Sequence, residues 1–92
     1  MIELKFSTST SGLAGFDLGK ETYEQQIESK YENYNEKLTL KFPDYVERVA
    51  SSFVQGLFSE LVNNIGYSGV KENVIIESKS EKLKNTIWDR LY

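Results

Sequence analysis

Residues 38–66 read LTLKFPDYVERVASSFVQGLFSELVNNIG, and this stretch predicts a strand followed by a long helix. Leu38, Leu40 and Phe42 alternate with polar residues, which is the two-residue period of a half-buried strand. Pro43 ends the alternation, because proline has no backbone N–H to donate to a neighbouring strand in the interior of a sheet. From residue 53 onward, apolar side chains recur in pairs every four positions, a stripe wide enough for a helix pressed firmly onto a sheet. The residues of the stripe are Phe53, Val54, Leu57, Phe58, Leu61, Val62 and Ile65.

Both ends of this helix carry sequence signals. Ser52 with Gln55 three residues later forms a capping-box pattern, so we expect Ser52 to be the N-cap. Ser51 would then keep a freer hydroxyl near the positive end of the helix, where a phosphate is favoured electrostatically. Gly66 is placed to end the helix through a left-handed cap.

The residues before this stretch predict a strand, a loop and a helix. Apolar residues alternate with polar ones over 2–6, as in a strand. Residues 7–19 have the composition of a loop, whose order the sequence leaves open. Its Gly19-Lys20 pair does not complete a phosphate-binding loop, because Ala14 and Glu21 stand where that motif needs glycine and serine or threonine. A first amphipathic helix follows over 20–34, with Tyr23, Ile27, Tyr31 and Tyr34 on one face.

The residues after the stretch complete a repeating order. Val74, Ile75 and Ile76 form a short β-branched run typical of an interior strand. Ser78 or Ser80 then caps a last helix, which contains Trp88. Three strand-then-helix units indicate an α/β fold: a single small domain over 1–92, with three to four mainly parallel or mixed strands and three helices packed on the sheet.

Composition narrows the possible functions. The chain has no cysteine and no histidine, so it cannot build disulfides, thiolate or imidazole metal sites, or catalytic dyads and triads that use those residues. This excludes most familiar small-enzyme chemistries but does not by itself decide the function, and an enzyme with a carboxylate mechanism is kept as a residual alternative. We expect a non-enzymatic protein without cofactor or metal. No run approaches the roughly 18 apolar residues of a membrane span, and residues 1–10 do not resemble a signal peptide, so we expect a cytoplasmic location. Lysines near the end of the chain are diluted by acids, which argues against direct nucleic-acid binding.

The net charge of −3 is concentrated in one segment. Residues 17–36 hold six acidic residues against Lys20 and Lys30. At helical spacing such a row is usually a solvated face, but beside tyrosines it is also a candidate interaction surface. The residues of this candidate acidic interface are Glu21, Glu24, Glu28 and Glu32.

Residues 38–61 resemble the core of a STAS-like domain family of unknown function, related to anti-sigma factor antagonists. In that family a strand ending in phenylalanine leads through a connection containing valines to a Ser-Ser-Phe helix start. The positions that carry the likeness are Phe42, Val46, Val49, Ser51, Ser52, Phe53, Leu57, Phe58 and Leu61.

The resemblance implies a STAS-type fold and a regulatory role. Anti-sigma factor antagonists dock onto a histidine-kinase-like ATPase and are switched by phosphorylation of a serine at this helix start. By position Ser51 would inherit that role, with Ser52 second. This chain departs from the Asp-Ser-Ser-Gly-Leu-Gly of the antagonists, since it reads Ala-Ser-Ser-Phe-Val-Gln over 50–55. The expected partner-binding residues are Asp44, Tyr45, Arg48, Ser51, Ser52, Gln55 and Ser59.

Two further alternatives stay open at this point. The chain could be a small acidic inhibitor or accessory protein, of the kind that mobile elements carry, whose glutamate-rich first helix covers a basic surface on its target. A homodimer formed through an exposed edge of the small sheet is also compatible with the sequence.

Overall fold

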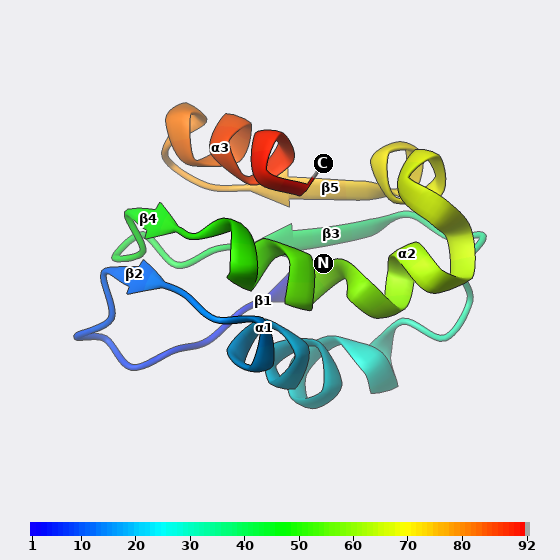
Figure 1. The fold of residues 1–92 in the computed structure, drawn as a ribbon, viewed down its shortest axis with the longest axis horizontal. Coiled ribbons are helices and arrows are strands. Elements are labelled where there is room, and N and C mark those ends of the chain that lie inside the picture. Colours follow the sequence, from blue (N-terminus) through cyan, green and yellow to red (C-terminus); the bar gives the residue numbers. More distant parts are fainter. Residues whose placement is uncertain (92) are drawn as a thin grey trace.

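A computed structural model describes residues 1–91 (Figure 1). Strands and helices alternate along the chain, and the first helix continues through a π-helical turn, η1, and a 3-10 turn, η2. The elements are β1 (Ile2–Glu3), β2 (Gly12–Leu13), α1 (Phe16–Thr22), η1 (Tyr23–Ile27), η2 (Glu28–Lys30), β3 (Leu38–Lys41), β4 (Arg48–Val49), α2 (Ser51–Asn73), β5 (Val74–Glu77) and α3 (Glu81–Leu91).

The main sheet has three strands in the order β1-β3-β5, and both pairings are parallel. Leu40 lies between Ile2 and Ile76 in the register. Strands β2 and β4 form a separate short parallel pair just before α1 and α2. The α/β class, the mostly parallel strands and the three helices are as the sequence predicts.

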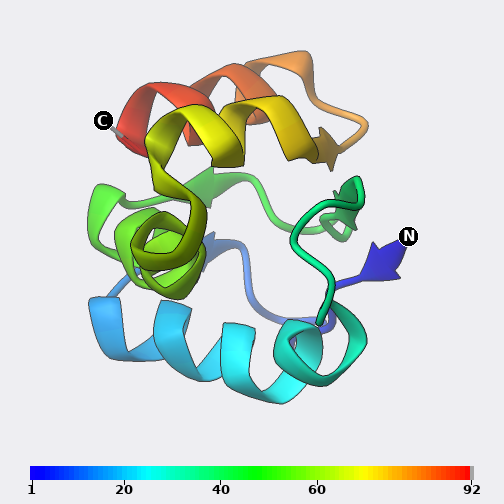
Figure 2. The same ribbon diagram turned by 90° about the vertical axis from the view of Figure 1, so that its right-hand side faces the viewer.

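All three helices cover one face of the main sheet, and Figure 2 shows the three strands of this sheet on the right and the first half of α2 on the left. Alternation along each strand explains this two-layer arrangement, because every second side chain points toward the helices. The other face carries the charged row Glu3, Lys41 and Glu77, one residue from each strand, all exposed. This face is unusual, since both faces of a parallel sheet are normally covered.

Two glycines set the distance between α1 and α2. A Cβ at Gly19 would lie 2.2 Å from the carbonyl oxygen of Phe53, and one at Gly56 would lie 2.1 Å from that of Phe16. The two helices therefore touch backbone to backbone. Gly19, which does not complete a phosphate-binding loop, thus has a packing role instead. Side chains of α2 fill the core beneath them, with Phe53, Leu57 and Phe58 fully buried.

The first helix differs from the prediction in both position and shape. It begins at Phe16 rather than residue 20 and its last turn ends at Lys30 rather than residue 34. Gly15, with φ of 104°, starts it inside the stretch predicted to be a loop, which also contains β2. Tyr31 is nevertheless buried beyond the helix end, where its hydroxyl donates to the carbonyl oxygen of Glu36 at 2.7 Å.

The predicted cap of α2 was wrong. Ala50 is the N-cap residue, and α2 begins at Ser51 with no side-chain hydrogen bond to its first turn. Gly66 was expected to end the helix; it interrupts it, with φ of 74° and ψ of 171°, but helical structure resumes and runs to Asn73. For α3, Ser80 is confirmed as a capping residue, because its Oγ accepts from the Leu83 N–H at 3.1 Å.

Candidate functional site

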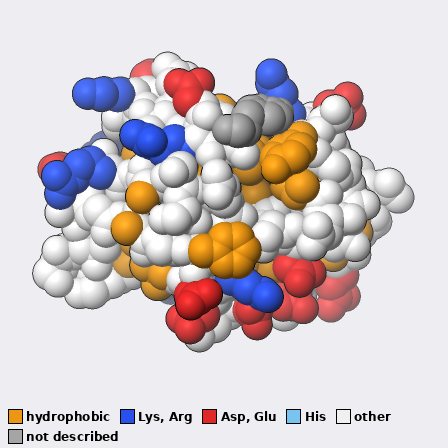
Figure 3. Space-filling model, in the orientation of Figure 1, with side chains coloured by type: hydrophobic (Ala, Val, Ile, Leu, Met, Phe, Trp, Pro, Cys, Tyr) orange, Lys and Arg blue, Asp and Glu red, His pale blue; other side chains and the backbone are white. Residues whose placement is uncertain are grey.

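A groove on the helix side of the molecule is the candidate site. It has a volume of about 270 Å³ and lies where the start of α1, the middle of α2 and the end of α3 meet. In Figure 3, which views this side, apolar side chains are exposed on the surface. The lining residues are Phe16, Gln55, Ser59, Val62, Asn63, Tyr67 and Leu91.

Phe16 provides the main apolar surface of the groove. Phe16 is the first residue of α1, and it is 45% exposed. The carbonyl oxygen of Phe16 lies close to the backbone of Gly56, so the close helix crossing holds Phe16 beside α2. The helix crossing therefore fixes an exposed aromatic ring at the wall of a groove, which is a feature of protein-binding surfaces.

Ser51 lies on the same stripe of α2 as the groove residues Gln55 and Ser59, since these positions are four apart. It is exposed and occupies the first turn, where backbone N–H groups lack helical partners. An added phosphate would meet the positive end of the helix dipole there. The structure thus places the hydroxyl of Ser51 one turn from the groove.

Ser52 has a different environment. Its side chain is half-buried, and its Oγ accepts a hydrogen bond from the Gly15 N–H at 2.9 Å. This bond joins the residue before α1 to the first turn of α2. Ser52 therefore supports the helix crossing, and its hydroxyl is less accessible than that of Ser51.

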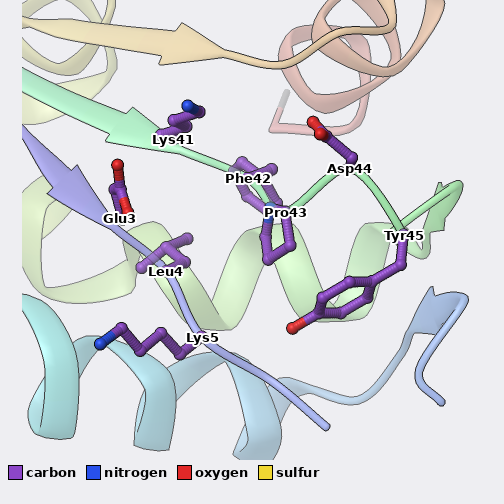
Figure 4. Close-up of a pocket in the computed structure, with 8 residues that line it drawn as sticks. All are labelled: Glu3, Leu4, Lys5, Lys41, Phe42, Pro43, Asp44 and Tyr45. Carbon is purple, nitrogen blue, oxygen red and sulfur yellow. The ribbon is translucent and has the colours of Figure 1, made fainter. Parts of the chain in front are cut away.

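The remaining predicted partner-binding residues lie elsewhere. Asp44 and Tyr45 line a hollow of about 250 Å³ at the carboxyl ends of β1 and β3 (Figure 4). The Asp44 carboxylate pairs with Lys79 at 3.2 Å, and the Tyr45 hydroxyl accepts from the Phe6 N–H at 3.2 Å. Arg48 is exposed in β4 beside Gly12. Of the seven predicted residues, only Gln55 and Ser59 line the groove, with Ser51 close to it.

The groove residues that the sequence analysis missed are Phe16, Val62, Asn63, Tyr67 and Leu91. Phe16 gave no signal, because it lies seven residues before Tyr23 and eleven before Ile27, and this helical spacing would group it with those buried residues. The others could not have been grouped, because only the packing of α3 on α2 brings Leu91 next to Val62 and Asn63.

The predicted acidic interface is exposed along α1, η1 and the segment beyond them. Glu21, Glu24, Glu28 and Glu32 are all exposed, and within residues 1–91 none of them forms an ion pair. In Figure 3 acidic side chains gather along the lower edge, where α1 runs in Figure 1. Three of the glutamates line a hollow of about 420 Å³ together with Tyr31 and Tyr34.

A buried phenol lies beneath this acidic surface. Tyr23 is only 1% exposed, and its hydroxyl lies near Tyr34 without a well-formed hydrogen bond to any of the described residues. Burial raises the pKa of Tyr23 above its ordinary value, and the neighbouring Tyr34 raises it further. Burial also raises the pKa of Tyr31. Both phenols therefore stay neutral to a higher pH than an ordinary tyrosine.

The described part of the chain has neither a metal-binding cluster nor a membrane-spanning helix. Its carboxylate side chains form no group of three or more that could bind a metal ion. None of its helices has both the length and the apolar character that a bilayer span requires.

Comparison with known proteins gives no match to a family model, to a curated protein or to a solved structure. The likeness to the STAS-like family over residues 38–61 therefore remains a prediction from the residues themselves.

Proposed function

We propose that this chain is a non-enzymatic regulatory module that binds a partner protein through the groove on its helix side. The observation that carries the proposal is Phe16, an aromatic side chain held 45% exposed at the groove wall by the close packing of α1 on α2. Aromatic residues contribute strongly to binding when a partner covers them. A histidine-kinase-like ATPase is the class of partner that the resemblance to the STAS-like family implies.

We further propose that Ser51 regulates this binding as a phosphorylation site. A phosphate on Ser51 would bring a charge of about −1.5 to −2 to the end of the groove. The helix dipole would stabilise that charge at the first turn of α2, so the fold would tolerate it. The same charge would oppose an apolar or acidic partner surface that extends past Gln55.

The experiment begins with affinity capture by the wild-type chain from lysate of its source cells, and identification of what is retained. Binding of the purified partner is then measured by calorimetry for Phe16→Asp, Leu18→Asp and Ser51→Asp. Leu18 is the matched control, because it is an exposed apolar residue of α1 that does not line the groove. We expect Phe16→Asp and Ser51→Asp to weaken binding at least tenfold, and Leu18→Asp to change it by less than threefold. Equal effects of the Phe16 and Leu18 variants would reject the groove as the binding site.

The acidic surface supports a second candidate function, an inhibitor or accessory protein that covers a basic surface on its target. Glu24, Glu28 and Glu32 line one hollow and lack ion-pair partners among residues 1–91, so their charge is available to a partner. Their combined replacement by lysine should abolish binding if this function is correct, and should leave groove-mediated binding intact. Binding that depends on these glutamates should also weaken steeply as salt is added, because exposed charges are screened.

A further inference from the structure

The outer edge of β5 has backbone groups that no strand uses. In the β3–β5 pairing, the Phe42 N–H donates to the carbonyl oxygen of Glu77 at 2.9 Å, so the backbone of Glu77 points toward β3. Neighbouring residues of a strand direct their backbone groups to opposite sides, and Ile76 therefore points its N–H and C=O away from the sheet. Within residues 1–91 neither group has a hydrogen-bond partner, whereas the Val74 N–H donates to the carbonyl oxygen of Val70.

A hollow of about 430 Å³ lies beside this edge. It is bounded by β5 on one side, by α3 on the other and by the end of α2. Figures 1 and 2 show β5 as the last strand of the main sheet, with α3 running next to it. Trp88 contributes an apolar wall, since its half-buried ring stacks on Phe58 with the ring centroids 6.3 Å apart. Ile75, 48% exposed, adds apolar surface on the open face of the sheet.

The rim of the hollow is mainly positive. Lys71 and Lys84 line it with Glu81 and Asn85. The Lys84 ammonium pairs with the Glu81 carboxylate at 2.9 Å, which leaves Lys71 without an ion-pair partner in the described structure. A ligand that enters the hollow with a carboxylate would therefore meet an uncompensated cation.

We propose that the β5 edge binds an extended, acidic peptide segment of a partner protein, which adds to the sheet as a fourth strand. A free N–H and C=O on one edge residue are matched by an extended backbone, as in strand addition. Alternate side chains of the added strand would point into the hollow toward Trp88 and Asn85, and an acidic one would reach Lys71. This surface is separate from the proposed docking groove, so either binding function can hold without the other.

The test starts with selection of displayed random seven-residue peptides on the immobilised wild-type chain. The peptide enriched most strongly is synthesised and added to the 15N-labelled chain, and amide exchange and chemical shifts are followed by NMR. We expect enriched peptides to contain aspartate or glutamate between β-branched residues. We also expect binding to slow exchange of the Ile76 amide at least tenfold, because its N–H becomes hydrogen bonded.

Variants separate this site from others without disturbing the core. Asn85→Trp fills the hollow from an exposed position of α3, and Lys82→Trp adds the same bulk at an exposed position outside it. We expect Asn85→Trp to weaken peptide binding at least tenfold and Lys82→Trp to leave it unchanged within twofold. Lys71→Glu should likewise weaken binding of acidic peptides tenfold, with Lys82→Glu as its control.

Three results would overturn the proposal. The selection could enrich no peptide, or the enriched peptide could shift only residues of the docking groove and leave the Ile76 amide unaffected. The Ile76 amide could also be protected in the free chain in a concentration-dependent way, which would show that a second copy covers the β5 edge.

Discussion

The side-chain amide of Gln26 binds the backbone of Lys5 through two hydrogen bonds. Its Oε1 accepts from the Lys5 N–H at 2.7 Å, and its Nε2 donates to the Lys5 carbonyl oxygen at 2.8 Å. These are the bonds that a neighbouring strand would make to the chain just after β1. The first helical segment thus satisfies part of one sheet edge, whereas the backbone of the buried Ile76 on the opposite edge has no strand partner within residues 1–91. An edge satisfied in this way is a poorer template for pairing with another chain.

Gln26→Ala should destabilise the fold and loosen this edge. Loss of both hydrogen bonds at a partly exposed position should lower the free energy of unfolding by about 1 kcal/mol. Exchange of the Lys5 amide should become faster, which NMR can follow. Gln25→Ala is the matched control, because Gln25 is the exposed neighbour in η1. Equal exchange rates at Lys5 in both variants would contradict the assigned role of Gln26.

Gly19→Ala should be strongly destabilising. The added methyl group would lie 2.2 Å from the Phe53 carbonyl oxygen and would push α1 away from α2. We expect a loss of about 2–3 kcal/mol in urea denaturation. Gly12→Ala serves as the control, since its nearest new contact would be an ordinary 3.7 Å from the Arg48 side chain. A stable Gly19→Ala variant would show that the two helices can separate without cost.

Ser52→Ala and Ser51→Ala should differ in stability. Removing the Ser52 hydroxyl leaves the half-buried Gly15 N–H without its acceptor and should cost about 1 kcal/mol. Ser51 is exposed and makes no cap bond, so its replacement should change stability by no more than about 0.5 kcal/mol. Thermal or urea unfolding distinguishes the two; the reverse order would mean that Ser51 is the structural residue.

Tyr23→Phe should change how stability depends on pH. The pKa of Tyr23 in the folded chain is raised above its ordinary value of about 10, so the folded state holds this proton more tightly than the unfolded state. Its contribution is therefore fully present below pH about 10 and is lost as the pH rises further. Urea midpoints at pH 7, 9 and 11 should show wild type losing more stability than Tyr23→Phe in the alkaline range.

At pH 7 the same variant should be as stable as wild type or up to about 1 kcal/mol more stable, because it removes an unpaired buried hydroxyl. A large loss at pH 7 would mean that the hydroxyl has a partner. Parallel midpoint curves for the two proteins between pH 7 and 11 would instead reject Tyr23 as the alkaline-sensitive group.

Periodicity in the sequence predicted the buried side of the fold well. The alternation in β3 and the stripe of α2 were visible because each burial pattern follows one element's own geometry. Helix starts were less predictable: Ser52 has the residue type of a cap, but its hydroxyl bonds to Gly15, a residue far away in sequence. The start of α1 was missed because Gly15 and Gly19 resemble loop residues, although Gly19 is needed for the contact with α2.

The candidate site was predictable only in part, for a similar reason. Gln55 and Ser59 could be placed on one stripe of α2 because they are four residues apart. Phe16 joins them only through the crossing of two helices, which no local pattern encodes. Asp44 and Tyr45 are near Ser51 in sequence, but β4 and the turn before it direct them to the carboxyl ends of β1 and β3.

The parallel sheet has a consequence for how the chain folds. Ile2 pairs with Leu40, and Leu38 pairs with Val74. In the sequence, a whole helical segment therefore lies between each strand of the main sheet and the next strand that pairs with it. Contacts between residues so distant in sequence slow folding, because the loop must close before they form. During synthesis β1 has no strand to pair with until β3 emerges, and β5 joins only after Glu77 has been made. Until then the apolar residues of β1 and β3 depend on α1 and α2 for protection from aggregation.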